Sequence, residues 1–457
     1  MNKNIIEAVI EAPAEALELG IEGGQRLAKT FPLTGQGPFK KAKGYWYLLG
    51  PGLTTGASDD DPSGIATYSQ TGAQYGYGLL WLAAFTFPLM AVIQEMCARI
   101  GLVTGRGLAG NIRTHFGKKV LYISTLMLFA ANTFNIGADI GAMANAVQLV
   151  VPRSSFTLLV IGLTLSILLL QIFTPYVKYA RYLKWLALVL GAYILAAILA
   201  HPNWSSVLRY SVVPHFTFTK SQILLTCAIL GTTITPYLFF WQTSQEIEEE
   251  IAIGQTTIKQ RMGSSKPEMK RMRIDVWSGM LLSNVVMFFI IVACGSVLFS
   301  HGITTISTAA EAAQALRPFA GNASYFLFAA GILGIGLLAI PVLAGSSAYA
   351  ISESMGKRQG LNSKLKQGYA FYGVIIISML VGLGLNFIGL NPIKALIYSA
   401  VLNGIVAPVI LVLILLIARN KKLMGEWANG KLSASLGWFL TTIMTVAGLA
   451  AIYSLFP

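Results

Sequence analysis

Charged residues are scarce in this chain. Asp, Glu, Lys and Arg make up 11% of its 457 residues, whereas about 25% is usual in a soluble domain. Negative charge is the scarcer sign, with 19 Asp and Glu against 33 Lys and Arg. This low charge content excludes an ordinary soluble domain and predicts a chain that lies mostly in lipid.

Cysteine and histidine are also few. The three cysteines lie far apart inside apolar runs, and the four histidines fall in loops or at the ends of those runs. Neither set has the spacing of a disulfide framework or of a zinc site. We therefore expect buried structural thiols, solvated imidazoles and no resident metal or other cofactor.

The N-terminus lacks the long apolar run of a secretory signal. Its glutamates instead recur every three or four residues, which places them along one stripe of a helix. This pattern predicts a cytoplasmic amphipathic tail over residues 1–43. The stripe consists of Glu7, Glu11, Glu15, Glu18 and Glu22.

Apolar runs are abundant after the tail. A helix needs roughly 20 residues to cross a bilayer, and we count eleven such runs in residues 44–457. They predict an all-α integral membrane protein with 11 transmembrane helices. The runs are centred near residues 60, 90, 135, 164, 190, 235, 287, 335, 378, 407 and 447.

The basic residues follow the predicted topology. All but five of the 33 Lys and Arg fall on the same side as the N-terminal tail. This bias predicts a cytoplasmic N-terminus and an extracytoplasmic C-terminus in a plasma (inner) membrane. It explains the net charge of +14 without a nucleic-acid partner. The five exceptions are Arg153, Arg209, Lys220, Arg317 and Lys394.

Two of the predicted spans contain helix-breaking steps near their middle, Asp61-Pro62 and Thr235-Pro236. Proline removes a backbone donor and pushes the preceding residue out of helical geometry. Paired interruptions at matching positions indicate an inverted-repeat transporter with its site at the breaks. The predicted repeats cover about 44–202 and 219–420, and helix 11 covers about 436–456.

Acidic side chains gather at the first of these breaks. Asp59, Asp60 and Asp61 are consecutive, and no Lys or Arg lies in the same span. Buried carboxylates that repel one another need a cation or a proton, and ionisable groups within a membrane are candidate functional groups. A bound cation is the simplest explanation. Glu95 and Asp139 are the other acids well inside predicted spans.

The chain resembles the NRAMP family of divalent metal transporters, which share the LeuT fold. The similarity covers roughly residues 44–456 and is clearest in two stretches. The first runs from Gly50-Pro51-Gly52 through Asp61-Pro62-Ser63-Gly64 to Gly76-Tyr77-Gly78-Leu79-Leu80-Trp81, and the second is Gln94-Glu95-Met96-Cys97-Ala98-Arg99-Ile100-Gly101-Leu102-Val103-Thr104-Gly105-Arg106.

This resemblance implies a metal site at the two breaks, with several ligands changed. Asp61 occupies the position of the metal-binding Asp, whereas Gly64 occupies that of a metal-binding Asn. In the sixth helix Thr235 replaces the thioether of Met and Tyr237 replaces a His. The backbone carbonyl ligand falls on Thr232. These residues form the metal site that we expect, together with Asp59 and Asp60, which either bind water around the ion or line the vestibule.

The changed ligands favour a hard ion. Thioethers suit soft transition metals, whereas carboxylates, carbonyls and water suit Mg²⁺, Ca²⁺ and Mn²⁺. Smaller side chains at Gly64 and Thr235 are also expected to enlarge the site for a partly hydrated ion. In these respects the chain is similar to the NRAMP-related magnesium transporters.

Proton coupling is expected to be weak or absent. The resemblance places Asn135 and Ala138 where the family has acids on its proton route, with Asp139 one position away. A second histidine of the family aligns with Gln242. The roles of Glu95, Asn135, Asp139 and Asn403 are left open: Glu95 lines an aqueous path or snorkels to the surface, and Asn403 binds metal or packs between helices.

The predicted function is therefore movement of Mg²⁺ and/or Mn²⁺ by alternating access, with the bilayer and the ion as its partners. No obligate protein partner is expected. Two alternatives of the same class are a proton-coupled Mn²⁺/Fe²⁺ symporter and a LeuT-fold transporter of an organic cation. A membrane enzyme or receptor leaves the two breaks unexplained and lacks a nucleophile–base pair.

Overall fold

The computed structural model describes residues 50–174, 191–361, 365 and 368–455, and these residues are almost entirely helical or in short connections. The chain divides into two units, residues 1–50 and 51–457, and the second is described below. The predicted amphipathic tail lies outside the described residues, as does part of the fifth predicted span.

Both predicted helix breaks are confirmed. The first span consists of α3 (Pro51–Asp59) and α4 (Pro62–Tyr75), and the sixth consists of α12 (Lys220–Thr233) and α13 (Pro236–Ala252). Each second half begins with its proline at the first helical position, where the new helix does not need the missing N–H. The preceding half-helix does lose that donor, so it ends before the proline.

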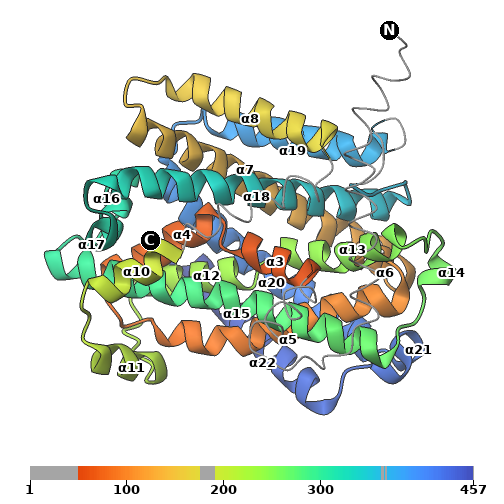
Figure 1. Ribbon diagram of the computed structural model, residues 1–457. Coiled ribbons are helices and arrows are strands. Elements are labelled where there is room, and N and C mark those ends of the chain that lie inside the picture. The colour runs from red at the N-terminus through yellow and green to blue at the C-terminus, as the bar shows by residue number, and fades with distance from the viewer. Residues whose placement is uncertain (1–49, 175–190, 362–364, 366–367, 456–457) are drawn as a thin grey trace, which may run out of the picture. The chain divides into compact units, whose positions relative to one another are not determined.

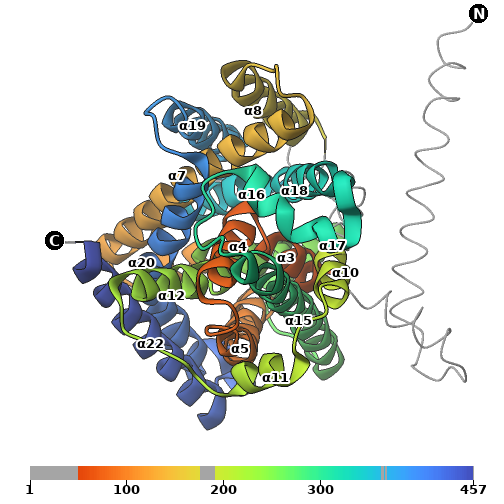
Figure 2. The ribbon, with the colours of Figure 1, turned by 90° about the vertical axis from the view of Figure 1, so that its left-hand side faces the viewer.

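Long helices surround these two broken segments. Figure 2 looks along the bundle and shows α4 and α12 in its interior, with the long helices around them. These helices are α5 (Trp81–Thr104), α7 (Lys118–Val150), α15 (Lys266–Val297), α18 (Ser324–Met355) and α20 (Pro392–Arg419). Packing of α4 on α15 and of α12 on α20 places both breaks in the protein interior.

The remaining helices lie at the side and at the ends of the bundle. In Figure 1, α8 (Phe156–Phe173) and α19 (Tyr369–Leu385) lie together along one side, and α22 (Lys431–Leu455) lies along another. Short helices cap both ends. One end carries α10 (Gly191–Leu199), α11 (Trp204–Val212), α16 (Ala309–Ala313) and α17 (Arg317–Ala320), and the other carries α6 (Leu108–His115), α14 (Ile258–Arg261) and α21 (Lys421–Met424).

Close helix contact holds α3 against α15. A Cβ atom built on Gly56 would lie 2.2 Å from the carbonyl oxygen of Gly279, and one built on Gly279 would lie 2.0 Å from that of Gly52. Only glycine allows backbones to approach so closely, as in membrane helix pairs generally. Asp275 of α15 adds two hydrogen bonds from the amides of Gly52 and Leu53, at 2.6 and 3.1 Å. The first half-helix is thus anchored to α15.

Membrane-spanning segments are evident from length and composition. Within the described residues, eight helical segments are long and apolar enough to cross a bilayer, and α19 is a shorter apolar helix. The total of eleven spans and the repeat boundaries stay predictions, because the half-helices α3 and α4 are short and residues 175–190 are not described. All three cysteines are buried, as expected.

The charged segment 246–275 is largely helical. Within it α13 continues to Ala252 and α15 begins at Lys266. Glu246 and Asp275 therefore lie within helices, 5% and 3% exposed. The capping box of Ser265 and Glu268 starts α15 before its apolar residues begin.

Candidate metal-binding site

Asp61 lies at the first helix break, as the N-cap residue of α4. Its Oδ1 atom accepts hydrogen bonds from the backbone N–H of Gly64 at 2.8 Å and from the hydroxyl of Ser63 at 2.6 Å. An N-cap carboxylate satisfies free amides of the first turn and lies at the positive end of the helix dipole. These hydrogen bonds therefore favour the ionised form of Asp61, in opposition to its burial.

The other oxygen of Asp61 contacts two further helices. Asn135 of α7 donates its amide N–H to Asp61 Oδ2 at 2.7 Å, and Ser399 of α20 donates to Asn135 Oδ1 at 2.7 Å. All three side chains are at most 1% exposed. Sequence reasoning had left the role of Asn135 open and had not identified Ser399, because nothing in the local sequence shows that α7 and α20 meet at the break.

Thr235 holds the equivalent position at the second break, but its side chain is not used as a cap. Its hydroxyl is buried and has no hydrogen-bond partner. A buried hydroxyl without a partner is unfavourable by about 1–3 kcal/mol. Thr235 is therefore a neutral oxygen donor that the fold leaves available.

Each proline also removes the donor for one backbone carbonyl. The helical partner of the Ser58 carbonyl would be the N–H of Pro62, and that of Thr232 would be the N–H of Pro236. The hydroxyl of Tyr237 donates to the Ser58 carbonyl at 2.9 Å. Among the described residues no donor reaches the Thr232 carbonyl, so it is available as a ligand.

The two breaks approach each other at Gly64. The hydroxyls of Ser63 and Thr232 lie 3.5 Å apart, and a Cβ atom on Gly64 would lie 3.1 Å from Thr232 Oγ1. That separation is too tight for an ordinary contact. Glycine at position 64 was expected to enlarge the site. On the side that faces the second break it does not, because the Thr232 side chain fills the space.

Asp59 and Asp60 face α15. The hydroxyl of Ser283 lies 2.6 Å from Asp59 Oδ2 and 3.3 Å from Asp60 Oδ1, while Asp59 Oδ1 has no partner. Asp61 bonds instead to α7. The three carboxylates thus share one break but contact different helices, and no group of three or more His, Cys, Asp or Glu in the described chain is placed to hold a metal.

Among the described residues no basic side chain forms an ion pair with these acids. Within the described ranges the ion pairs all involve Glu95, which contacts Arg99 at 3.5 Å and Arg273 at 2.9 Å. Asp59, Asp60 and Asp61 are at most 2% exposed. Buried carboxylates without a cationic partner are strongly unfavourable, so the break is complementary to a positive charge.

The residues whose roles were left open now have defined surroundings. Glu95 also accepts from the indole N–H of Trp277 at 2.8 Å, so it joins α5 to α15. Asp139 lies one turn beyond Asn135 on α7, fully buried, and neither of its oxygens has a hydrogen-bond partner. Asn403 of α20 is likewise buried without a partner.

A methionine side chain lies close to the second break. Met287 of α15 is fully buried, and its thioether lies 3.8 Å from the hydroxyl of Thr233, at the end of α12. Thr233 also contacts the hydroxyl of Tyr68 at 3.2 Å. Met287 belongs to no motif that the sequence analysis recognised, so its place beside the second break was not predicted.

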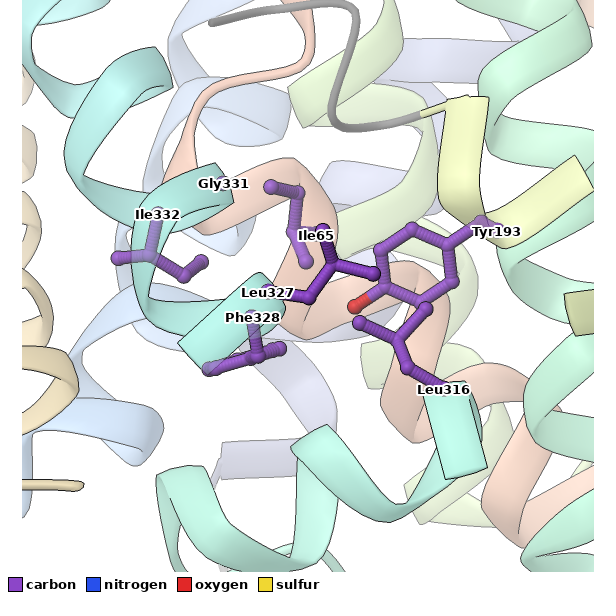
Figure 3. Close-up of a pocket in the computed structure, with 7 residues that line it drawn as sticks. All are labelled: Ile65, Tyr193, Leu316, Leu327, Phe328, Gly331 and Ile332. Carbon is purple, nitrogen blue, oxygen red and sulfur yellow. The ribbon is translucent and has the colours of Figure 1, made fainter. Parts of the chain in front are cut away.

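Small hollows with mainly apolar linings lie beside α4. A small hollow beside α4 is lined by Ile65, Tyr193 and Leu316, together with residues at the start of α18 (Figure 3). A second hollow touches Pro62 and Ile65, also among mainly apolar side chains. Neither hollow is lined by a carboxylate, which fits a site enclosed by protein in this structure.

Known proteins resemble this chain over most of its length. Two relatives named divalent metal cation transporter MntH are similar: that of Clostridium acetobutylicum is 26% identical, covering 91% of this chain and 93% of the relative, and that of Chromohalobacter salexigens is 24% identical, covering 90% and 91%.

Solved structures show the same fold. The manganese transporter of Eremococcus coleocola aligns with a TM-score of 0.68 at 19% identity, covering 93% of this chain and 89% of that one. A transporter of the nucleobase-cation-symport-1 family aligns with a TM-score of 0.54 at 13% identity, covering 89% and 91%. These likenesses confirm the predicted all-α, LeuT-type membrane fold.

The family is shown by the sequence itself. The profile described as natural resistance-associated macrophage protein-like matches residues 52–454, which is most of the chain and includes both breaks. The resemblance noted from the motifs is thereby confirmed, and this protein belongs to the Nramp family.

Proposed function

We propose that this protein transports a hard divalent metal ion, Mg²⁺ and/or Mn²⁺, across the plasma membrane by alternating access. The observation that carries the proposal is Asp61, a buried carboxylate at a helix break with no basic partner in the part of the chain that the structure describes. The free carbonyl of Thr232 and the unpartnered hydroxyl of Thr235 supply neutral oxygens at the opposite break. The names of the relatives, which refer to divalent metal and manganese transporters, agree with a metal cargo.

The donor set supports a hard ion. Carboxylate, carbonyl and hydroxyl oxygens prefer Mg²⁺, Ca²⁺ and Mn²⁺ over soft metals. Mg²⁺ keeps several waters and is bound through one or two carboxylates, which fits Asp61 with one of its acidic neighbours as a contact for bound water. A membrane potential of 100 mV, negative inside, would favour entry of a doubly charged ion by about 4.6 kcal/mol. Uptake would therefore not require a second ion.

Uptake into proteoliposomes tests this function. Wild-type protein should take up Mg²⁺ or Mn²⁺ with saturation, and Asp61→Ala should not, while both proteins elute alike from a sizing column. Undiminished uptake by Asp61→Ala would remove the site from the proposal. A strong preference for Cd²⁺ or Fe²⁺ over Mg²⁺ would contradict a hard site.

We also propose that coupling to protons is weak or absent. The position expected to carry an acid is Asn135, whose amide is held between Asp61 and Ser399. The described histidines are exposed and remote from the breaks. A pH-sensitive dye inside the vesicles should show no acidification in step with metal uptake, and parallel acidification would refute this part.

A second candidate is the proton-coupled Mn²⁺/Fe²⁺ symporter. It is favoured by Asp139, whose carboxyl group is fully buried and has no hydrogen-bond partner, on the same face of α7 as Asn135. Asp139→Asn distinguishes the two. Loss of dye acidification with retained metal uptake supports the symporter, whereas no acidification in either protein supports the facilitator.

We propose that the end of the bundle carrying α6, α14 and α21 is cytoplasmic. The basic clusters at 99–119, 259–273 and 419–431 lie at or near this end, and such residues are retained in the cytoplasm. Labelling of single cysteines introduced at Lys259 and at Arg317 with an impermeant reagent tests the orientation. Only the cysteine at 317 should react from outside intact cells.

A further inference from the structure

The carboxylate of Asp61 is almost fully occupied by the protein itself. An ionised carboxylate offers about four lone-pair positions. Gly64 and Ser63 take both positions on Oδ1, and Asn135 takes one on Oδ2. One position, on Oδ2, is left for a cargo ion.

The orientation of Asn135 is fixed by its surroundings. A carboxylate can only accept hydrogen bonds, so Asn135 must present its NH₂ group to Asp61. Its carbonyl oxygen then faces Ser399, which donates to it at 2.7 Å. Asn135 and Ser399 are both fully buried, so water does not replace either contact. The amide is held in the one orientation that occupies a lone pair of Asp61 Oδ2.

We propose that Asn135, held by Ser399, is a specificity-determining residue that restricts Asp61 to binding its cargo through a single oxygen and so selects against Ca²⁺. This inference rests on the proposed function. Neither residue is a ligand itself, because the amide nitrogen of Asn135 cannot bind a cation and its oxygen is engaged. Asn135 acts by limiting what Asp61 can do.

The coordination chemistry of the two ions gives the reason. Mg²⁺ takes six ligands at about 2.0–2.1 Å, usually one oxygen from each carboxylate and several waters. Ca²⁺ takes about 6–8 ligands and readily uses both oxygens of a carboxylate. Both lone pairs of Oδ1 and one lone pair of Oδ2 are occupied. Asp61 can therefore offer the single oxygen that Mg²⁺ uses, and it cannot offer the two oxygens that Ca²⁺ often uses.

The test is competition between the two ions. Uptake of Mg²⁺ into proteoliposomes is measured with increasing Ca²⁺ outside, and the ratio of the inhibition constant of Ca²⁺ to the KM for Mg²⁺ is determined. Asn135→Leu has similar volume, removes the donor and excludes water. It should lower this ratio roughly tenfold or more, the equivalent of one hydrogen bond to a charged group.

Two further variants grade the effect. Asn135→Ala leaves room for a water that can donate to Asp61, so its ratio should fall less than that of Asn135→Leu. Ser399→Ala keeps the amide but frees its orientation, and roughly a twofold fall is expected. If Asn135→Leu does not fold, Ser399→Ala decides the question, because Ser399 is separated from Asp61 by the whole amide.

Asn132 provides the matched control. It lies on the same helix, is fully buried and donates to Ser346 and Ser347 at 2.9 Å, but it has no contact with Asp61. Asn132→Ala should leave the Mg²⁺/Ca²⁺ ratio unchanged. An equal fall in the Asn132 and Asn135 variants, or no fall in folded Asn135→Leu, would overturn the inference.

The outcome also separates this inference from the proposed function. Saturable Mg²⁺ or Mn²⁺ uptake by wild type that Ca²⁺ inhibits equally well would remove the selection and leave the transport function standing. Absence of any divalent uptake by wild-type protein would remove the transport function itself.

Discussion

The two helix breaks are built alike in backbone and differently in side chains. Each has a proline that starts the second half-helix and a carbonyl that the proline leaves without its helical partner. At the first break Asp61 caps the helix and accepts three hydrogen bonds. At the second break Thr235 makes none. The first break therefore supplies fixed negative charge, and the second supplies neutral oxygen without a set partner.

This difference separates two requirements of a transport site. A cation needs charge to replace its lost hydration, and a preorganised carboxylate provides it without rearrangement. The cation must also be released, and neutral oxygen ligands, which bind it less strongly than a carboxylate, allow this. Because Asp61 already accepts three hydrogen bonds in this structure, we propose that the second break is the part whose hydrogen bonding changes most when an ion binds.

Removal of charge at the first break should have the largest effect. Asp61→Asn keeps the shape of the side chain but removes its charge, and should lower uptake (kcat/KM) on the order of 100-fold or more, the equivalent of about 3 kcal/mol. Thr235→Val removes only a neutral oxygen of the same size and should lower it less than about tenfold. Initial rates of Mn²⁺ uptake give both values. Equal losses at the two breaks would contradict the division of roles.

Sulfur at the second break should change the preferred ion. Thr235→Met places a thioether beside the Thr232 carbonyl and should raise uptake of Cd²⁺ relative to Mg²⁺ about tenfold, since soft ligands favour soft metals. Thr235→Leu is the control for size, and it should not raise this ratio. An equal increase in the two variants would mean that space, and not sulfur, governs the choice.

The sequence predicts features that depend on neighbouring residues in the chain, and it does not predict contacts between distant helices. Asp61-Pro62 and Thr235-Pro236 were identifiable because proline acts on its own neighbours along the chain. Asn135, Ser399 and Ser283 bond to the acids from α7, α20 and α15, and their importance depends on packing that no local pattern records. The buried state of Glu246 and Asp275 was missed for a related reason, since charge suggests exposure unless a partner helix is known.

The contact between the breaks should contribute to stability more than to uptake. Tyr237→Phe removes the hydroxyl that donates to the Ser58 carbonyl and leaves a buried acceptor unpaired, so the free energy of unfolding should fall by about 1 kcal/mol or somewhat more. Tyr68→Phe is the control, because its partner Thr233 also donates to the Ile229 carbonyl at 2.7 Å. Thermal unfolding in detergent should rank Tyr237→Phe below Tyr68→Phe. The reverse order would show that Ser58 finds another donor.

The smallest expected effect concerns the far ends of the two first half-helices. The N-terminus of α3 is held by Asp275 from α15, whereas α12 is capped by its own Thr219, which accepts from the Gln222 amide at 3.3 Å. Asp275→Asn weakens a buried, charged contact between helices, and Thr219→Ala removes an exposed local cap, so losses of about 1 and about 0.5 kcal/mol are expected. Only Asp275→Asn should also release α3 from α15. A cysteine at Leu53 should then react faster with a thiol reagent in Asp275→Asn and at the wild-type rate in Thr219→Ala. If both backgrounds leave the rate unchanged, the glycine contact between Gly56 and Gly279 alone holds α3, and the two half-helices are anchored more alike than their hydrogen bonds suggest.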